Sequence, residues 1–80
     1  MKKTQIIVRD DYDSFCDTMD DCIKRTQDVF KSNKDIKIEG HVFCSSFDIC
    51  SGAVDICYPD NLDSFVLLEL RKNHIISNHS

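Results

Sequence analysis

The stretch DDYDSFCDTMDDCIKRTQDVFKSN, residues 10–33, decides the fold. Its less polar residues recur at steps of three and four, which keeps them on one face of a helix with 3.6 residues per turn. Asp10 or Asp11 can cap the N-terminus, and further Asp residues in the first turn suit the positive end of the helix dipole. The pattern therefore predicts one long amphipathic helix. Its stripe consists of Tyr12, Phe15, Cys16, Met19, Cys22, Ile23, Thr26, Val29 and Phe30.

Segments on both sides of this helix are typical of strands. Residues 4–9 form a short apolar run bounded by charge, and residues 36–44 alternate between apolar and polar. Two further strands are expected at 47–50 and 53–58, with a turn at Ser51-Gly52 between them. A helical period also runs through residues 43–57, but Gly52 and several poor helix formers disfavour a helix there. Residues 64–72 (SFVLLELRK) fit a strand or a short helix, and we expect a strand.

Together these elements predict an α+β fold with the order β-α-β-β-β. One long amphipathic helix packs on one face of a small, mostly antiparallel sheet. Eighty residues leave no room for a second domain, so residues 1–80 are expected to form one. Residues 73–80 are either a flexible tail or a segment that packs on the sheet through Ile75 and Ile76.

The alternation also predicts how the strands pair. Turns at Ser45-Ser46 and Ser51-Gly52 place Ile49 opposite both Val42 and Val54, which makes one face uniformly apolar. On the other face Asp48 then opposes Asp55. Since one helix covers only one face, the second face is expected to expose apolar side chains and to bind a partner, unless the tail covers it. That second face is expected to carry Phe43, His41, Cys50, Cys57, Phe65 and Leu67, besides Asp48 and Asp55.

Charge points to a protein partner. The net charge of −4 argues against a general nucleic-acid binder or a membrane-surface binder, because both need clustered Lys and Arg. Residues 10–21 contain six Asp and no Lys or Arg. Two pairs of favourable order, Asp20 with Lys24 and Asp21 with Arg25, offset this charge in part. Carboxylates three or four residues apart on a helix lie ~5–6 Å apart, similar to the phosphates of one nucleic-acid strand, so this face could occupy a nucleic-acid groove.

The five cysteines are an odd number, which favours free thiols over a disulfide scaffold. His41, Cys44, Cys50 and Cys57 could supply a zinc site, but His41 and Cys44 point to opposite faces of a strand and no C-x2-C pair is present. Cys50 beside His41 could form a nucleophilic pair, yet such coincidences are common among so many candidates. We therefore expect no cofactor, no metal and no catalysis.

Location follows from two expected absences. No run approaches the ~20 apolar residues of a membrane helix. The apolar run behind Met1-Lys2-Lys3 is too short for a signal peptide. We expect the protein in the cytoplasm, which is the host cytoplasm if a phage encodes it.

The expected function is non-catalytic protein binding, as a small cytosolic regulator or inhibitor. Small acidic chains without a catalytic set are typical of inhibitors that phages and mobile elements direct against host nucleases or defence complexes. The expected partner is a basic protein surface, for example that of a nucleic-acid-binding protein. A zinc-binding domain and a homodimeric structural protein remain alternatives. The candidate partner-binding residues are Asp10, Asp13, Asp17, Asp20, Asp21, Phe43, Asp48, Asp55, Phe65 and Leu67.

Overall fold

The structure is a computed structural model that describes residues 1–45 and 48–76. It has the α+β architecture and the antiparallel sheet that the sequence predicts. The element order, β-α-β-β-α, differs from the expected one at its last member. The elements are β1 (Lys2–Asp11), α1 (Phe15–Val29), β2 (Lys37–Ser45), β3 (Ile49–Tyr58), the 3-10 turn η1 (Asp60–Leu62) and α2 (Asp63–Lys72).

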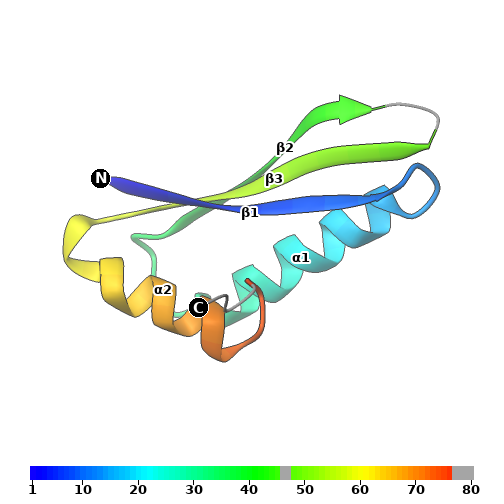
Figure 1. Cartoon of the computed structure of the whole chain (residues 1–80). Coiled ribbons are helices and arrows are strands. Elements are labelled where there is room, and N and C mark those ends of the chain that lie inside the picture. Colours follow the sequence, from blue (N-terminus) through cyan, green and yellow to red (C-terminus); the bar gives the residue numbers. More distant parts are fainter. Residues whose placement is uncertain (46–47, 77–80) are drawn as a thin grey trace.

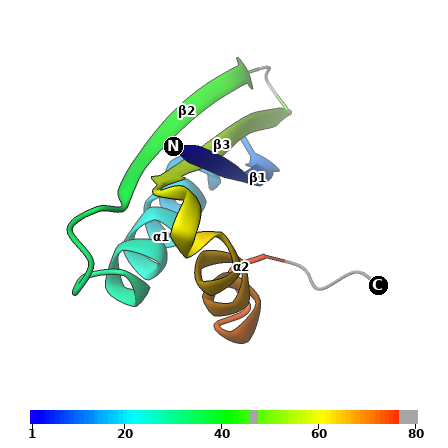
Figure 2. The same cartoon turned by 90° about the vertical axis from the view of Figure 1, so that its left-hand side faces the viewer.

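The three strands form one sheet in the order β1-β3-β2, with both neighbours antiparallel to the central β3. Both helices lie on the same side of this sheet (Figures 1 and 2). The fold therefore has two layers, and the sheet has one covered face and one open face. Within the described residues, neither helix is long and apolar enough to cross a lipid bilayer.

The core lies between the sheet and the helices. Alternate residues of β1 and β3 face the helices, so Ile6 and Val8 are buried while Ile7 between them is exposed. The helices contribute residues at helical spacing, Phe15 and Met19 from α1 among them. The buried apolar cluster comprises Ile6, Val8, Phe15, Met19, Phe30, Cys50, Val54, Ile56, Tyr58, Val66 and Leu70.

Helix α1 begins later than predicted, because β1 is longer. Asp10 and Asp11 do not cap the helix: they pair with Cys50 and Ile49 in the β1–β3 ladder. The ladder satisfies backbone groups that a helix start at residue 10 would leave without partners. Ser14 takes the N-cap position, without a side-chain hydrogen bond to the helix.

The predicted turn at Ser51-Gly52 is wrong, since both residues lie inside β3. Gly52 has a negative φ and serves close packing instead of chain reversal. A Cβ atom placed there would lie 2.5 Å from the His41 carbonyl oxygen and 2.9 Å from Phe15 Cζ. Glycine thus marks a point where α1 and β2 approach β3 closely.

The predicted strand register is also wrong. Val42 pairs with Gly52 instead of Ile49, and a bulge between Val42 and Cys44 shifts the remaining ladder. Consequently Asp48 does not oppose Asp55: Asp48 precedes β3, whereas Asp55 pairs with Gln5 and Glu39. Because residues 51–52 form no turn, every strand partner that was predicted from that turn is different in the structure.

Residues 63–72 form a helix, so the preferred strand is wrong and the alternative is correct. Val66 and Leu70, four residues apart, are both fully buried against the core. Asp63 in the first turn and Arg71 and Lys72 in the last turn suit the helix dipole. A segment that was expected to extend the sheet therefore adds a second helix to its covered face.

The described part of the tail, residues 73–76, does not cover the open face, and residues 77–80 lie outside the described residues. Ile75 and Ile76 pack against the buried cluster, on the helix side. The open face is also not the apolar surface that we expected, because Phe65 and Leu67 lie on α2. Cys50 lies on the covered side of the sheet, buried in the core cluster.

Candidate functional site

Exposed carboxylates and exposed apolar side chains gather at one end of the molecule. At this end of the sheet β1 leads into α1, β2 ends and β3 begins (Figure 1). The Tyr12 N–H donates to the Asp48 carbonyl oxygen at 3.3 Å, which ties the β1–α1 turn to the start of β3. We call this region the acidic end and define it by Asp11, Tyr12, Asp13, Asp17, Phe43, Asp48 and Ile49.

The apolar members of the acidic end are large and accessible. Tyr12 is 59% exposed, Phe43 57% and Ile49 49%. Phe43 lies within the bulge of β2, while Tyr12 lies directly after β1. An aromatic side chain with carboxylates around it offers a partner both contact area and charge.

The charge of the acidic end is not neutralised within the chain. Among the described residues, Asp13, Asp17 and Asp48 take part in no ion pair, whereas Asp20 contacts Lys24 Nζ at 3.8 Å and Asp28 contacts Lys31 Nζ at 3.4 Å. Negative charge without an ion-pair partner is therefore concentrated at the start of α1. Such a concentration of charge accelerates association with a basic partner.

Asp10 has a structural role, unlike its acidic neighbours. Its carboxylate accepts hydrogen bonds from the Thr18 hydroxyl and, at 2.8 Å, from the Asp11 N–H. The Thr18 bond, followed by the Asp11 bond, lowers the pKa of Asp10 below its ordinary value. Asp10 thereby holds the β1–α1 turn against the first turns of the helix.

The helix carries the remaining predicted carboxylates on its exposed face. Asp20 forms the predicted pair with Lys24. Asp21 does not pair with Arg25, because the Arg25 guanidinium donates instead to the Asn73 carbonyl oxygen at 3.1 Å. Asp20 and Asp21 are both exposed and extend the acidic surface along α1.

The predicted apolar contact residues do not form one surface. Phe65 and Leu67 lie on α2, and Figure 1 shows that helix away from the β2–β3 end of the sheet, where Phe43 lies. Phe65 also packs edge-on against Phe30, with ring centroids 6.2 Å apart. Phe43 is thus the one predicted aromatic residue that the structure places at the acidic end.

Asp55 lies on the open sheet face and is only 7% exposed. Its Oδ2 contacts His41 Nε2 at 3.0 Å and Lys3 Nζ at 3.7 Å. Its Oδ1 has no hydrogen-bond partner. Asp55 was a candidate partner-binding residue, but its neighbours enclose it and leave its carboxylate little exposed.

Cysteine and histidine do not converge in the described part of the chain. Cys50 is buried on the covered side of the sheet. His41 pairs with Ala53 and lies on the open face, so the two side chains are not neighbours. Among the described residues, no group of three His, Cys, Asp or Glu side chains is placed to hold a metal ion. Cys16, Cys22, Cys50 and Cys57 are free thiols, and burial raises the pKa of Cys22.

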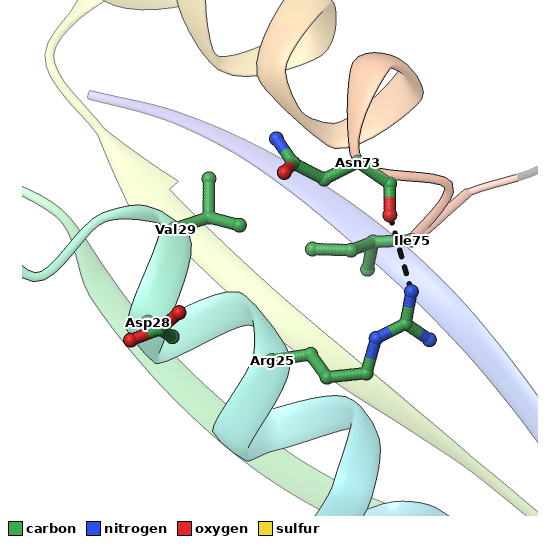
Figure 3. Close-up of a pocket in the computed structure, with 5 residues that line it drawn as sticks. All are labelled: Arg25, Asp28, Val29, Asn73 and Ile75. Atoms are coloured by element: carbon green, nitrogen blue, oxygen red, sulfur yellow. Dashed lines mark hydrogen bonds between the residues drawn. The ribbon is translucent and has the colours of Figure 1, made fainter.

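Two of the hollows in the described part of the chain adjoin residues discussed above. One, of about 410 Å³, opens at the acidic end and is lined by Arg9, Asp10, Asp11 and Ile49. The other, of about 140 Å³, lies between α1 and the end of α2, where Arg25 and Ile75 face each other (Figure 3). Arg25 fastens the two helices across this second hollow, so its role is structural.

Sequence reasoning missed Tyr12 and Ile49 as surface residues. It placed Tyr12 on the apolar helix stripe and Ile49 on the uniformly apolar face. The three aspartates around Tyr12, at positions 10, 11 and 13, were the available signal that this aromatic side chain lies in a solvated turn.

Comparison with known proteins gives no match: no protein-family model, curated protein or solved structure is similar to this chain.

Proposed function

We propose that this protein is a small non-catalytic protein-binding module that recognises a basic protein surface through its acidic end. The observation that carries the proposal is the gathering of Tyr12 and Phe43 with unpaired Asp13, Asp17 and Asp48 at one end of the fold. Aromatic anchors within a charged rim are a common arrangement in protein interfaces.

Charge selects the class of partner. Three carboxylates without an ion pair among the described residues repel phosphates and attract Lys and Arg. A nucleic-acid-binding protein presents such a basic surface, so the module would act as a regulator or inhibitor that competes for a nucleic-acid groove. An inhibitor that a phage or mobile element directs against a host nuclease or defence complex, in the host cytoplasm, is the form of this proposal that the size and charge of the chain favour.

The proposal is tested by capture from a lysate with matched charge variants. Asp13→Asn/Asp17→Asn/Asp48→Asn removes three charges at the acidic end. Asp28→Asn/Asp35→Asn/Asp60→Asn removes three exposed charges elsewhere and is the control. Proteins that the wild type and the control retain, and that the first variant releases, are expected to be basic and to elute as salt rises.

The proposal is wrong if the two triple variants retain the same proteins at the same salt concentration. It is also wrong if Tyr12→Ser and Phe43→Ser leave the affinity of a captured partner unchanged. Loss of an apolar anchor at the centre of an interface typically weakens binding about tenfold or more.

A further inference from the structure

The open face of the sheet carries its charges in a definite order along the strands. Residues that pair across strands share a face, and alternate residues of one strand share it too. From one end to the other, β1 contributes Lys3, Gln5, Ile7, Arg9 and Asp11. Beside them β3 contributes Cys57, Asp55, Ala53, Ser51 and Ile49, and β2 contributes Lys37, Glu39 and His41.

The middle row of this face holds Ile7, Ala53 and His41, and of these Ile7 is the exposed apolar side chain. Ile7 is 59% exposed and pairs with Ala53 at the centre of the sheet. Both helices lie on the other side of the sheet (Figures 1 and 2). The face also contains one incomplete interaction, the Oδ1 atom of Asp55, which is buried without a hydrogen-bond partner.

We propose that a second copy of this chain packs on the open face, sheet against sheet, about a two-fold axis that crosses the strands. This axis lays each strand antiparallel over the same strand of the second copy. A two-fold interface requires a surface that is complementary to itself, and the charge order along β1 and β3 meets this requirement.

The complementarity follows from the register. The axis passes at Ile7, so the exposed Ile7 side chain meets its own copy at the centre of the interface, above the buried Ala53. Asp11 then lies over the second copy's Lys3, and Arg9 lies beside the second copy's Asp55. Opposite charges therefore face each other at both ends of the interface, and Arg9 adds a cation near the second copy's Asp55.

The other two-fold arrangement brings like charges together. An axis parallel to the strands lays β1 over β2 of the second copy and places Lys3 over the second copy's Lys37, since both pair with Cys57. Like charges face to face oppose association. The charges on this face therefore select the axis that crosses the strands.

The size of the face sets the strength of association. Nine residues of β1 from Lys3 to Asp11 and three strands cover roughly 27 Å by 15 Å, or roughly 400 Å² per copy, from the usual strand rise and spacing. Standard protein interfaces bury ~800 Å² per partner. We therefore expect a weak dimer that dissociates on dilution and is favoured by low salt.

This inference does not rest on the proposed function. Asp11 and Ile49 border both surfaces, but Tyr12, Asp13, Asp17 and Asp48 lie beyond the paired residues of the sheet and remain accessible in the dimer. The two acidic ends lie at opposite ends of the dimer. Self-association is measured without any partner, so either proposal can fail alone.

The experiment is sedimentation equilibrium of the purified full chain from about 1 µM to about 1 mM, at low and at high salt. We expect a monomer at the lowest concentration, a dimer at the highest, and weaker association in high salt. A monomer throughout this range overturns the inference.

Variants then locate the contact. Ile7→Lys places two cations together on the two-fold axis and is expected to weaken the dimer at least tenfold. Leu68→Lys, at an exposed site on α2, is the control and is expected to dimerise as the wild type does. Equal dimerisation of these two variants overturns the inference, and so does a control that loses the dimer.

A charge exchange gives an independent test. Lys3→Glu and Asp11→Lys alone each place like charges face to face, whereas the double variant restores an attractive pair. We expect each single variant to dimerise more weakly than the double variant. A double variant that is no better than the weaker single variant contradicts the proposed axis. Far-UV circular dichroism of every variant confirms that the fold is retained.

Discussion

The Tyr58 hydroxyl donates a hydrogen bond to Asp63 Oδ1 at 2.6 Å, which joins the end of β3 to the start of α2. Lys2, which pairs with Tyr58 across the sheet, contacts the other oxygen of the same carboxylate at 3.1 Å. One carboxylate thus links β1, β3 and α2. This contact holds the second helix against the sheet at the end opposite the acidic end.

Alkaline pH tests the Tyr58–Asp63 bond. Burial, followed by the bond to Asp63, raises the pKa of Tyr58 to about 12. A raised pKa stabilises the fold below the unfolded value of ~10, and this contribution is lost as pH rises through the folded value. We expect Tyr58→Phe to lower the free energy of unfolding by about 1 kcal/mol at neutral pH.

Between about pH 10 and pH 12, wild-type stability in urea should fall more steeply than that of Tyr58→Phe. The matched control is Tyr12→Phe, which removes a hydroxyl from an exposed side chain instead of a buried one. Equal slopes for wild type and Tyr58→Phe would show that the phenol does not contribute.

Acid pH tests the other ordered carboxylate. Bonds from the Thr18 hydroxyl and the Asp11 N–H lower the pKa of Asp10. A lowered pKa gives stability that is present above the unfolded value of ~3.9 and is lost as pH falls through the folded value. Thr18→Ala should therefore raise the pKa of Asp10 in an NMR titration, whereas Thr18→Ser, which keeps the hydroxyl, should not. A titration unchanged in both variants contradicts the contact.

The two glycines of the sheet should respond differently to an added methyl group. At Gly52 a Cβ atom would lie 2.5 Å from a backbone oxygen, that of His41, which moves only if the strand moves. At Gly40 it would lie 2.8 Å from Ile23 Cδ1 and 3.2 Å from Met19 Cε, which are the ends of flexible side chains. We expect Gly52→Ala to lower the free energy of unfolding by about 2–3 kcal/mol and Gly40→Ala by less than about 1 kcal/mol. Urea unfolding measures both, and similar costs would refute this account of Gly52.

Gly52 also explains where sequence reasoning failed. A Ser-Gly dipeptide between apolar runs usually marks a turn, and it predicted one here. Only the packing of α1 on the sheet shows that the missing side chain makes room for Phe15. The strand register predicted from that turn was therefore wrong, and so were the predicted positions of Asp48 and Asp55.

The amphipathic period of α1 was readable because its steps of three and four extend over many residues. The sequence of α2 was ambiguous. Val66 and Leu70 are four residues apart, so they share one face in a strand as well as in a helix. The concentration of Asp residues in 10–21 was visible as well. The sequence did not predict which apolar side chains lie beside these Asp residues. Tyr12 and Phe43 come from distant segments, and only the tertiary fold brings them to the same end of the molecule.

A substitution at the end of α2 should stabilise the protein. His74 adopts a left-handed φ of 57°, with the Ile75 N–H donating to the Leu70 carbonyl oxygen at 2.9 Å. This position after a helix favours glycine, which has no Cβ to disfavour positive φ. We expect His74→Gly to raise the free energy of unfolding by about 0.5–1 kcal/mol. Lower stability of His74→Gly in urea would show that the imidazole makes a favourable contact.

Arg25 should stabilise the same helix end from the other side. Its guanidinium donates to the carbonyl oxygens of Asn73 at 3.1 Å and His74 at 3.5 Å, across the hollow shown in Figure 3. We expect Arg25→Gln to lower stability by about 1 kcal/mol, because a charged donor is lost at the negative end of a helix. Hydrogen exchange at the Ile75 and Ile76 amides should accelerate more than exchange in the sheet. The control is Lys24→Gln, which removes only an exposed ion pair with Asp20 and should cost less than about 0.5 kcal/mol. If both variants have the same stability and the same exchange at residues 75–76, the guanidinium does not fasten α2 to α1.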